Sequence, residues 1–171
     1  MNDSTAPQFS FVTHWKVEND ENNDAVLEFW RRENAIGDET QAKKRLSEIV
    51  LHARDRDGAI TGISTAVPIT LPRLGQPTYY FRCFIGKDWR KSRLVLSLLR
   101  RTCEVLEDYA RAHDFPCIGI VLEMENARFG ESLKRACWPS TGFVFIGKSQ
   151  RGLDLRVKYF RGAKLKGTAK S

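Results

Sequence analysis

The segment from Phe84 to Leu99, FIGKDWRKSRLVLSLL, constrains the fold of this chain more than any other segment. It reads as the end of a strand, a short basic loop and the first turns of a helix. The N-terminus of a helix offers backbone N–H groups and partial positive charge to an anion. We therefore expect a strand, loop and helix that together bind a phosphorylated ligand.

The composition is that of a globular protein, and its 171 residues suffice for one domain with its own core. We expect a disordered N-terminus at residues 1–9, a single domain at 10–160 and a flexible basic tail at 161–171. No apolar run approaches the roughly 20 residues of a membrane span. The polar N-terminus lacks the pattern of a secretory signal, so we expect a cytoplasmic protein without a membrane span.

The net charge of +7 arises from 28 basic and 21 acidic residues. Basic residues concentrate at Arg90–Arg101 and in the tail from Arg151 to Lys170. This distribution favours an anionic partner, such as a phosphorylated cofactor, an acidic carrier protein or nucleic acid. Nucleic acid is the least favoured of these, because no interleaved aromatic platform or recognition motif accompanies the basic residues.

The cysteines and histidines do not form a metal-binding pattern. The cysteines are widely spaced in apolar settings without a C-x-x-C pair, which predicts buried free thiols; they are Cys83, Cys103, Cys117 and Cys137. The three histidines are scattered, and none has the spacing of a metal-ligand cluster. We therefore expect no bound metal.

Hydrophobic periodicity predicts strand, two helices, three strands, helix, strand, helix and two strands. The predicted ranges are 11–17, 25–35, a second helix capped by Thr40, 50–54, 59–69, 78–85, 91–113, 117–124, 126–137, 143–148 and 153–160. Asp57-Gly58 marks a hairpin turn, and Pro68, Pro72, Gly75 and Pro77 mark a loop. The pattern predicts an α/β (α+β) fold, with six or seven strands in a mixed, mostly antiparallel sheet flanked by about four helices.

This order resembles the GNAT (general N-acetyltransferase) superfamily, and the resemblance covers nearly the whole chain. ARDRDGAITGISTAV is similar to the family's second and third strands, and FIGKDWRKSRLVLSLL to its fourth strand, loop and third helix. GIVLEMENARF is similar to its fifth strand, and TGFVFIGKSQRGLDLRVKYF to its closing hairpin. The resemblance implies an acyltransferase in which an amine attacks an acyl thioester directly, aided by positioning, carbonyl polarisation and proton transfer.

The family holds acyl-coenzyme A with its fourth strand and with a loop of pattern R-x-x-G-x-G/A. The resemblance assigns cofactor contacts to Cys83, Phe84, Ile85, Arg90, Lys91, Ser92, Arg93, Leu94, Val95 and Asn126. Asn126 fits equally well as a helix N-cap. Arg93 and Val95 stand where the family has glycines, which bring backbone close to phosphate. Either Arg93 binds phosphate through its guanidinium, or the loop no longer binds coenzyme A and Arg93 simply faces solvent.

For proton transfer, the resemblance points to the end of the fifth strand. Glu123 and Glu125 flank this end on the same face, and one of them would take the proton of the attacking amine. Solvated surface carboxylates are the alternative interpretation. The tyrosine that often serves the family as general acid falls at or near Trp138, which has no acidic proton, so we assign no general acid.

Three functions stay open. The first is transfer of an acyl group, chiefly acetyl, from acyl-coenzyme A to an unknown amine. The second uses an acidic acyl carrier protein and a longer chain; such relatives often lack the loop glycines and carry an arginine like Arg82, and Lys87–Arg101 would complement the carrier. The third is a degenerate GNAT fold that acts as a non-catalytic binding module. Homodimer formation also stays open.

Overall fold

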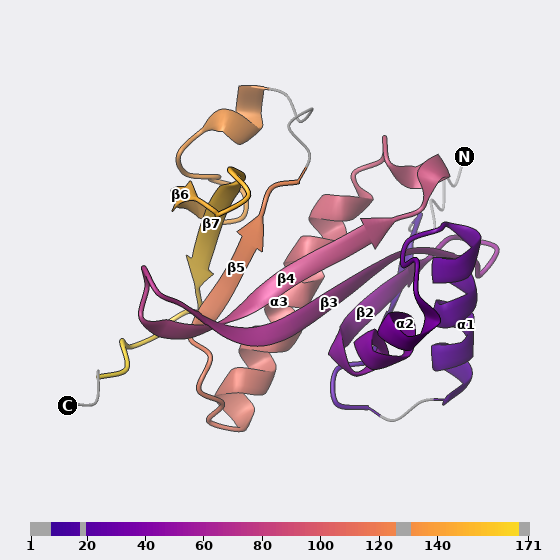
Figure 1. Cartoon of the computed structure of the whole chain (residues 1–171), viewed down its shortest axis with the longest axis horizontal. Helices are drawn as coiled ribbons and strands as arrows, with labels where there is room; N and C mark the ends of the chain where they lie inside the picture. The colour runs from indigo at the N-terminus through magenta and orange to yellow at the C-terminus, as the bar shows by residue number, and fades with distance from the viewer. Residues whose placement is uncertain (1–7, 18–19, 126–130, 168–171) are drawn as a thin grey trace, which may run out of the picture. The chain divides into compact units, whose positions relative to one another are not determined.

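A computed structural model describes residues 8–17, 20–125 and 131–167 of the chain (Figure 1). The candidate residue Asn126 lies outside these ranges. The strands are β1 Ser10–Thr13, β2 Ile49–Arg54, β3 Ile60–Leu71, β4 Gln76–Ile85, β5 Gly119–Glu123, β6 Val144–Lys148 and β7 Asp154–Tyr159. The α-helices are α1 Asp20–Arg32, α2 Glu39–Arg45 and α3 Leu94–Ala112; short 3-10 helices span Leu46–Glu48, Lys87–Trp89 and Glu131–Lys134.

The strands form one sheet in the order β1-β2-β3-β4-β5-β7-β6. The pairs β1–β2, β2–β3, β5–β7 and β6–β7 are antiparallel, whereas β4 and β5 are parallel. This confirms the predicted α/β fold with a mixed, mostly antiparallel sheet of seven strands. The hairpin expected at Asp57-Gly58 is also confirmed, because Arg54 pairs with Ile60 and Gly58 has a φ of 84°.

The chain divides into two compact units. The N-terminal unit comprises Met1–Thr65 and Cys83–Leu106, and the C-terminal unit comprises Ala66–Arg82 and Glu107–Ser171. No helix in the described ranges has the length and apolar character required to cross a bilayer.

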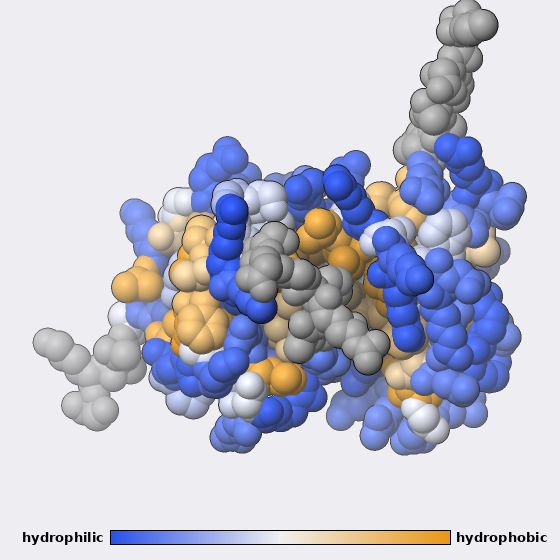
Figure 2. All heavy atoms as spheres, turned by 90° about the horizontal axis from the view of Figure 1, so that it is seen from above, coloured by the Kyte–Doolittle hydropathy of each residue, from blue (hydrophilic) through white to orange (hydrophobic). Residues whose placement is uncertain are grey.

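In the N-terminal unit, α1 buries one face against the sheet. Val26, Phe29 and Trp30 pack with residues of β2 and β3, because they fall on neighbouring turns of an amphipathic helix. The opposite face of α1 is hydrophilic, and Figure 2 shows such side chains gathered over the part of the unit that carries this helix. The first turns of α3 pack through Leu94 and Leu98 on β2.

The absence of a side chain at Gly62 permits the close packing of β3 and α3 within the N-terminal unit. A Cβ atom there would lie 2.8 Å from Cδ1 of Leu98 and 2.9 Å from Cδ1 of Ile85. Real Cβ atoms do not approach other atoms so closely, so glycine sets how near the start of α3 comes to the sheet.

In the C-terminal unit, Val121, Leu155 and Val157 form a core with Tyr80 and Ile146 packed against it. The buried Tyr79 ring stacks on Phe115 at 5.6 Å between ring centroids. Gly119 lets β5 approach β7, since a Cβ atom there would lie 2.5 Å from the carbonyl oxygen of Lys158.

Two predicted local features are wrong. Asp38, not Thr40, caps α2, because the backbone N–H of Thr40 donates to Oδ1 of Asp38 at 3.0 Å. The predicted loop at Pro68 belongs to β3, which continues to Leu71. The outer half of this strand has exposed positions such as Pro68, where a missing N–H is tolerated.

The helix predicted at residues 126–137 is also wrong over its described part. Residues 131–134 form a 3-10 helix, and Cys137 pairs instead with Val144 of β6. The carbonyl oxygens of Leu133 and Ala136 accept hydrogen bonds from the guanidinium of Arg156. Cys137 is exposed and Cys83 is half-buried, which corrects the expectation that all four free thiols are buried.

Candidate functional site

The loop between β4 and α3 is held by its own hydrogen bonds. The N–H of Gly86 donates to the carbonyl oxygen of Thr61 at 2.8 Å, and the N–H of Trp89 closes the short 3-10 turn on Gly86 at 2.9 Å. Ser92 donates to the carbonyl oxygen of Trp89 through both its N–H, at 3.0 Å, and its hydroxyl, at 2.6 Å. The loop therefore has a defined shape before any ligand binds.

Some backbone N–H groups of this loop already have acceptors within the protein. The N–H of Lys87 donates to Oε2 of Glu33 at 3.0 Å, and the N–H of Leu94 donates to Oγ of Ser92 at 3.2 Å. The carbonyl oxygen of Arg93 accepts from Leu96 and Ser97. Within the described ranges, the N–H of Val95 is then the one first-turn amide of α3 that lacks a protein acceptor.

The basic side chains of the loop supply most of its capacity for an anion. Lys87, Lys91 and Arg93 are exposed, and no carboxylate in the described parts of the chain pairs with them. The positive end of α3, a helix of 19 residues, adds to their field. A phosphate bound here would be met by flexible side chains rather than by a glycine-lined backbone cradle.

The side chains of the predicted cofactor residues near the end of β4 already make contacts within the protein. Phe84 lies edge-on to Phe29 at 5.9 Å, and Ile85 packs in the cluster of Leu94 and Leu98. Arg90 folds back onto this strand: its Nε donates to the carbonyl oxygen of Ile85 at 3.4 Å, and its guanidinium lies over the Phe84 ring at 5.7 Å. Cys83 is half-buried on the same strand.

The two predicted carboxylates lie in the C-terminal unit and are joined by one arginine. Nη2 of Arg151 is 3.0 Å from Oε2 of Glu123 and donates to Oε1 of Glu125 at 2.7 Å. The Tyr80 hydroxyl also donates to Oε2 of Glu123, at 2.9 Å. The Glu123 side chain is 9% exposed and that of Glu125 is 71% exposed, so the shared arginine joins an enclosed carboxylate to a solvated one.

The same cluster changes the ionisation of its members. Burial, followed by the hydrogen bond to Glu123, raises the pKa of Tyr80 to about 12. The phenol therefore keeps its proton near neutral pH and acts as a donor. The hydrogen bond to Glu125 raises the pKa of Arg151, which stays charged throughout. The Arg82 guanidinium lies over the Tyr80 ring at 5.2 Å.

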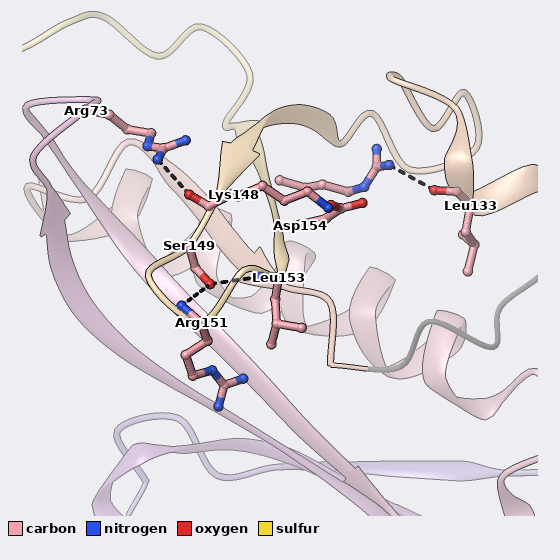
Figure 3. Close-up of polar contacts among 8 residues, drawn as sticks. Arg73, Leu133, Lys148, Ser149, Arg151, Leu153 and Asp154 are labelled. Carbon is pink, nitrogen blue, oxygen red and sulfur yellow. Dashed lines mark hydrogen bonds and ion pairs between the residues drawn. The ribbon is translucent and has the colours of Figure 1, made fainter.

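The turn between β6 and β7 fixes the backbone that carries Arg151. Oγ of Ser149 accepts from the N–H of Arg151 at 3.2 Å and from the N–H of Leu153 at 3.3 Å (Figure 3). The N–H of Ser149 pairs with the carbonyl oxygen of Leu153 at 2.8 Å, and Lys148 forms an ion pair with Asp154. These contacts close a tight hairpin at whose tip Arg151 projects.

Sequence reasoning missed Tyr80 and Arg151. Tyr80 pairs with Val121 in the parallel β4–β5 ladder, which makes it a diagonal neighbour of Glu123 on the same face. Period-two alternation on both strands, combined with a correct pairing, would have found Tyr80. Arg151 sits in a turn that the sequence marks, but its partners lie 26 and 28 residues before it.

Trp138 is buried and its indole N–H donates to the carbonyl oxygen of Leu133 at 3.1 Å. The Arg156 guanidinium lies over the Trp138 ring at 4.2 Å, and this arginine is only 1% exposed. Burial lowers the pKa of Arg156 below its ordinary value.

In the described part of the chain, no three histidine, cysteine or acidic side chains are grouped so as to hold a metal ion.

Solved structures with the same fold are acetyltransferases and related proteins. A GNAT-family acetyltransferase from Streptococcus pneumoniae superposes with a TM-score of 0.58 at 15% identity, covering 89% of this chain and 99% of that one. A ribosomal-protein-S5-alanine acetyltransferase from Vibrio fischeri gives 0.61 at 13% identity, covering 94% and 97%. AtaTR bound with acetyl-coenzyme A gives 0.59 at 13% identity, covering 90% and 94%.

Neither a protein-family model nor a curated protein matches the chain. At identities this low, the structural likeness establishes the fold. The chain therefore has the GNAT fold, as the four sequence segments implied.

Proposed function

We propose that this protein is an N-acyltransferase that moves an acyl group, chiefly acetyl, from acyl-coenzyme A to an amine. The observation that carries the proposal is the basic loop that opens α3 on a fold shared with acetyltransferases. One protein of that fold is bound with acetyl-coenzyme A. The proposal extends this ligand to the present chain.

In this proposal, the loop from Gly86 to Val95 binds the phosphate groups of coenzyme A. Lys91 and Arg93 supply charged donors, and the free N–H of Val95 supplies one backbone donor at the positive end of α3. In this proposal, the Arg93 side chain makes phosphate contacts that the backbone at glycine positions makes in the family pattern. The residues present fit an anion, although they differ from the family pattern.

The chemistry is direct aminolysis of a thioester. The amine nitrogen forms a bond to the carbonyl carbon, the carbon–sulfur bond breaks and the thiolate of coenzyme A leaves. The nitrogen loses one proton, and we assign its acceptance to Glu123, with Glu125 as the alternative. Glu123 is the more enclosed of the two, and its hydrogen bond with Tyr80 and its ion pair with Arg151 fix its orientation.

A thiol-release assay tests the proposal. The protein is incubated with acetyl-coenzyme A and a panel of primary amines that includes polyamines, free amino acids and peptides with a free N-terminus. We expect thiol release that depends on one class of amine, with the acylated amine identified by mass spectrometry. Release with a loaded acyl carrier protein instead would favour the carrier-dependent alternative.

The absence of amine-dependent release with acetyl-coenzyme A, a long-chain acyl-coenzyme A and a loaded carrier protein would contradict enzymatic function. In that case the fold would serve as a binding module. Glu123→Gln is the variant that separates chemistry from binding, since it retains the size of the side chain and removes the proton acceptor.

A further inference from the structure

We infer that Tyr80 and Arg151 are positioning residues that orient Glu123 so that its Oε1 atom receives the proton of the acceptor amine. The inference rests on the proposed function, because it assigns a role in the same reaction. The sequence singled out neither residue, and the proposed function requires neither.

The hydrogen bond from Tyr80 and the ion pair with Arg151 both involve the same oxygen atom of Glu123. The Tyr80 hydroxyl lies 2.9 Å from Oε2, and Nη2 of Arg151 lies 3.0 Å from Oε2. Across the residues that the structure describes, no side chain or backbone group donates to Oε1. An ionised carboxylate accepts hydrogen bonds at both oxygens, so this arrangement satisfies one oxygen and leaves the other available.

The two donors come from different elements, and each is held by packing or hydrogen bonds. Tyr80 packs from β4 against the core of Val121, Leu155 and Val157. Arg151 projects from the β6–β7 turn, whose shape Ser149 fixes. Glu123 ends β5, so three separate elements converge on a single carboxylate oxygen. A carboxylate anchored in this way cannot rotate freely, and a fixed base needs less reorganisation when it accepts a proton.

The geometry makes different predictions for different substitutions of Arg151. A single nitrogen makes both contacts, so a lysine ammonium at this position can replace them in part. We expect Arg151→Gln to lower kcat and Arg151→Lys to recover most of the loss. The matched control is Lys148→Gln, which removes the same charge from the same hairpin but pairs with Asp154 rather than with either glutamate.

For the second donor, Tyr80→Phe removes one hydroxyl and keeps the packed ring. We expect kcat to fall about tenfold, with KM for acyl-coenzyme A within about twofold, because the lost group orients a base and binds no substrate. Tyr159→Phe, on an exposed ring of β7, is the matched control.

A double-mutant cycle on the free energy of unfolding measures the contact between Tyr80 and Glu123 without an activity assay. Urea unfolding of Tyr80→Phe, Glu123→Ala and the double variant gives the coupling between the two side chains, because alanine removes the acceptor of the Tyr80 hydroxyl. We expect the double variant to lose less stability than the sum of the single losses. Additive losses would show that the hydrogen bond does not form, and the inference would then fall.

The outcomes separate this inference from the proposed function. An inactive wild-type protein overturns both. An active wild type whose Tyr80→Phe and Arg151→Gln variants keep kcat overturns the positioning role alone. Loss of kcat in these two variants, with recovery by Arg151→Lys and unchanged controls, supports it.

Discussion

His14 and His52 share a hydrogen bond of 2.6 Å between Nε2 of His14 and Nδ1 of His52, and both rings are buried. Nε of Arg54 donates to Nε2 of His52 at 2.9 Å. A guanidinium can only donate, so Nε2 of His52 accepts and its Nδ1 carries the proton. His52 then donates to His14, and the pair is folded as two neutral rings.

This pair predicts a loss of stability in mild acid. Burial lowers the pKa of His14 and brings the pKa of His52 to about 3, from an ordinary value of 6.5. Between pH 6.5 and 3 the unfolded chain binds protons that the folded chain does not. The free energy of unfolding therefore falls as pH falls through this window, and the pair has no such effect above pH 6.5.

Urea unfolding at pH 7.5, 6 and 5 checks this prediction. His52→Gln keeps a polar side chain without a titrating ring, and His113→Gln changes an exposed histidine as the control. We expect the wild type and the control to lose stability more steeply than His52→Gln below pH 6.5. Parallel pH dependence in all three proteins would contradict the assignment.

Arg73 covers carbonyl groups of β6, the last strand in the order of the sheet. Its guanidinium donates to the carbonyl oxygens of Ile146 at 2.5 Å and Lys148 at 2.7 Å, and Figure 3 shows its approach to Lys148. The register of β6 with β7 shifts between Phe145 and Gly147, as in a β-bulge, and Gly147 has a φ of 111°. A Cβ atom on Gly147 would collide with this guanidinium.

We expect Gly147→Ala to destabilise the fold by about 2 kcal/mol, because it strains a positive φ and displaces Arg73. Arg73→Ala alone should cost about 1 kcal/mol, since the exposed carbonyls regain water. The double variant should lose less than the sum, because the collision is then absent. Urea unfolding measures all three, and strictly additive losses would show that Gly147 and Arg73 do not interact.

The close packing around Gly62 predicts that a larger residue there changes both the stability of the core and the loop that opens α3. Gly62→Ala places a methyl group against Ile85 and Leu98, so it should cost about 1–3 kcal/mol and shift the start of α3. Affinity for acetyl-coenzyme A should fall with it. Gly37→Ala is the control, because no atom lies within 4 Å of a Cβ there. Equal stability and affinity in the two variants would contradict the packing argument.

Strongly periodic segments were predictable from the sequence. The strand predicted at 78–85 is Gln76–Ile85, and the helix predicted at 91–113 is Leu94–Ala112. Each of these two elements is indicated by the periodic spacing of apolar side chains within its own sequence. By contrast, Asp38 and Thr40 both suit a helix cap, and only the path of the chain decides between them.

Contacts that join distant segments could not be predicted in the same way. In the described part of the segment 126–137, the carbonyl oxygens of Leu133 and Ala136 accept hydrogen bonds from the distant Arg156, a contact that no local pattern reveals. The contact of Tyr80 with Glu123 depends on the register of β4 with β5, and that of Arg151 depends on a hairpin tip. The sequence therefore singled out Glu123 and Glu125 as candidate bases, a prediction that stays open, but it did not reveal their contacts with Tyr80 and Arg151.

Thermal unfolding in the presence of acetyl-coenzyme A tests whether the loop that opens α3 binds acyl-coenzyme A. At about 100 times its dissociation constant, a ligand adds roughly 2.7 kcal/mol to stability. We expect this stabilisation in the wild type and in Lys44→Gln, an exposed lysine of α2, and its loss in Lys91→Gln combined with Arg93→Gln. No stabilisation of the wild type by acetyl-coenzyme A, coenzyme A or a long-chain acyl-coenzyme A would contradict the account.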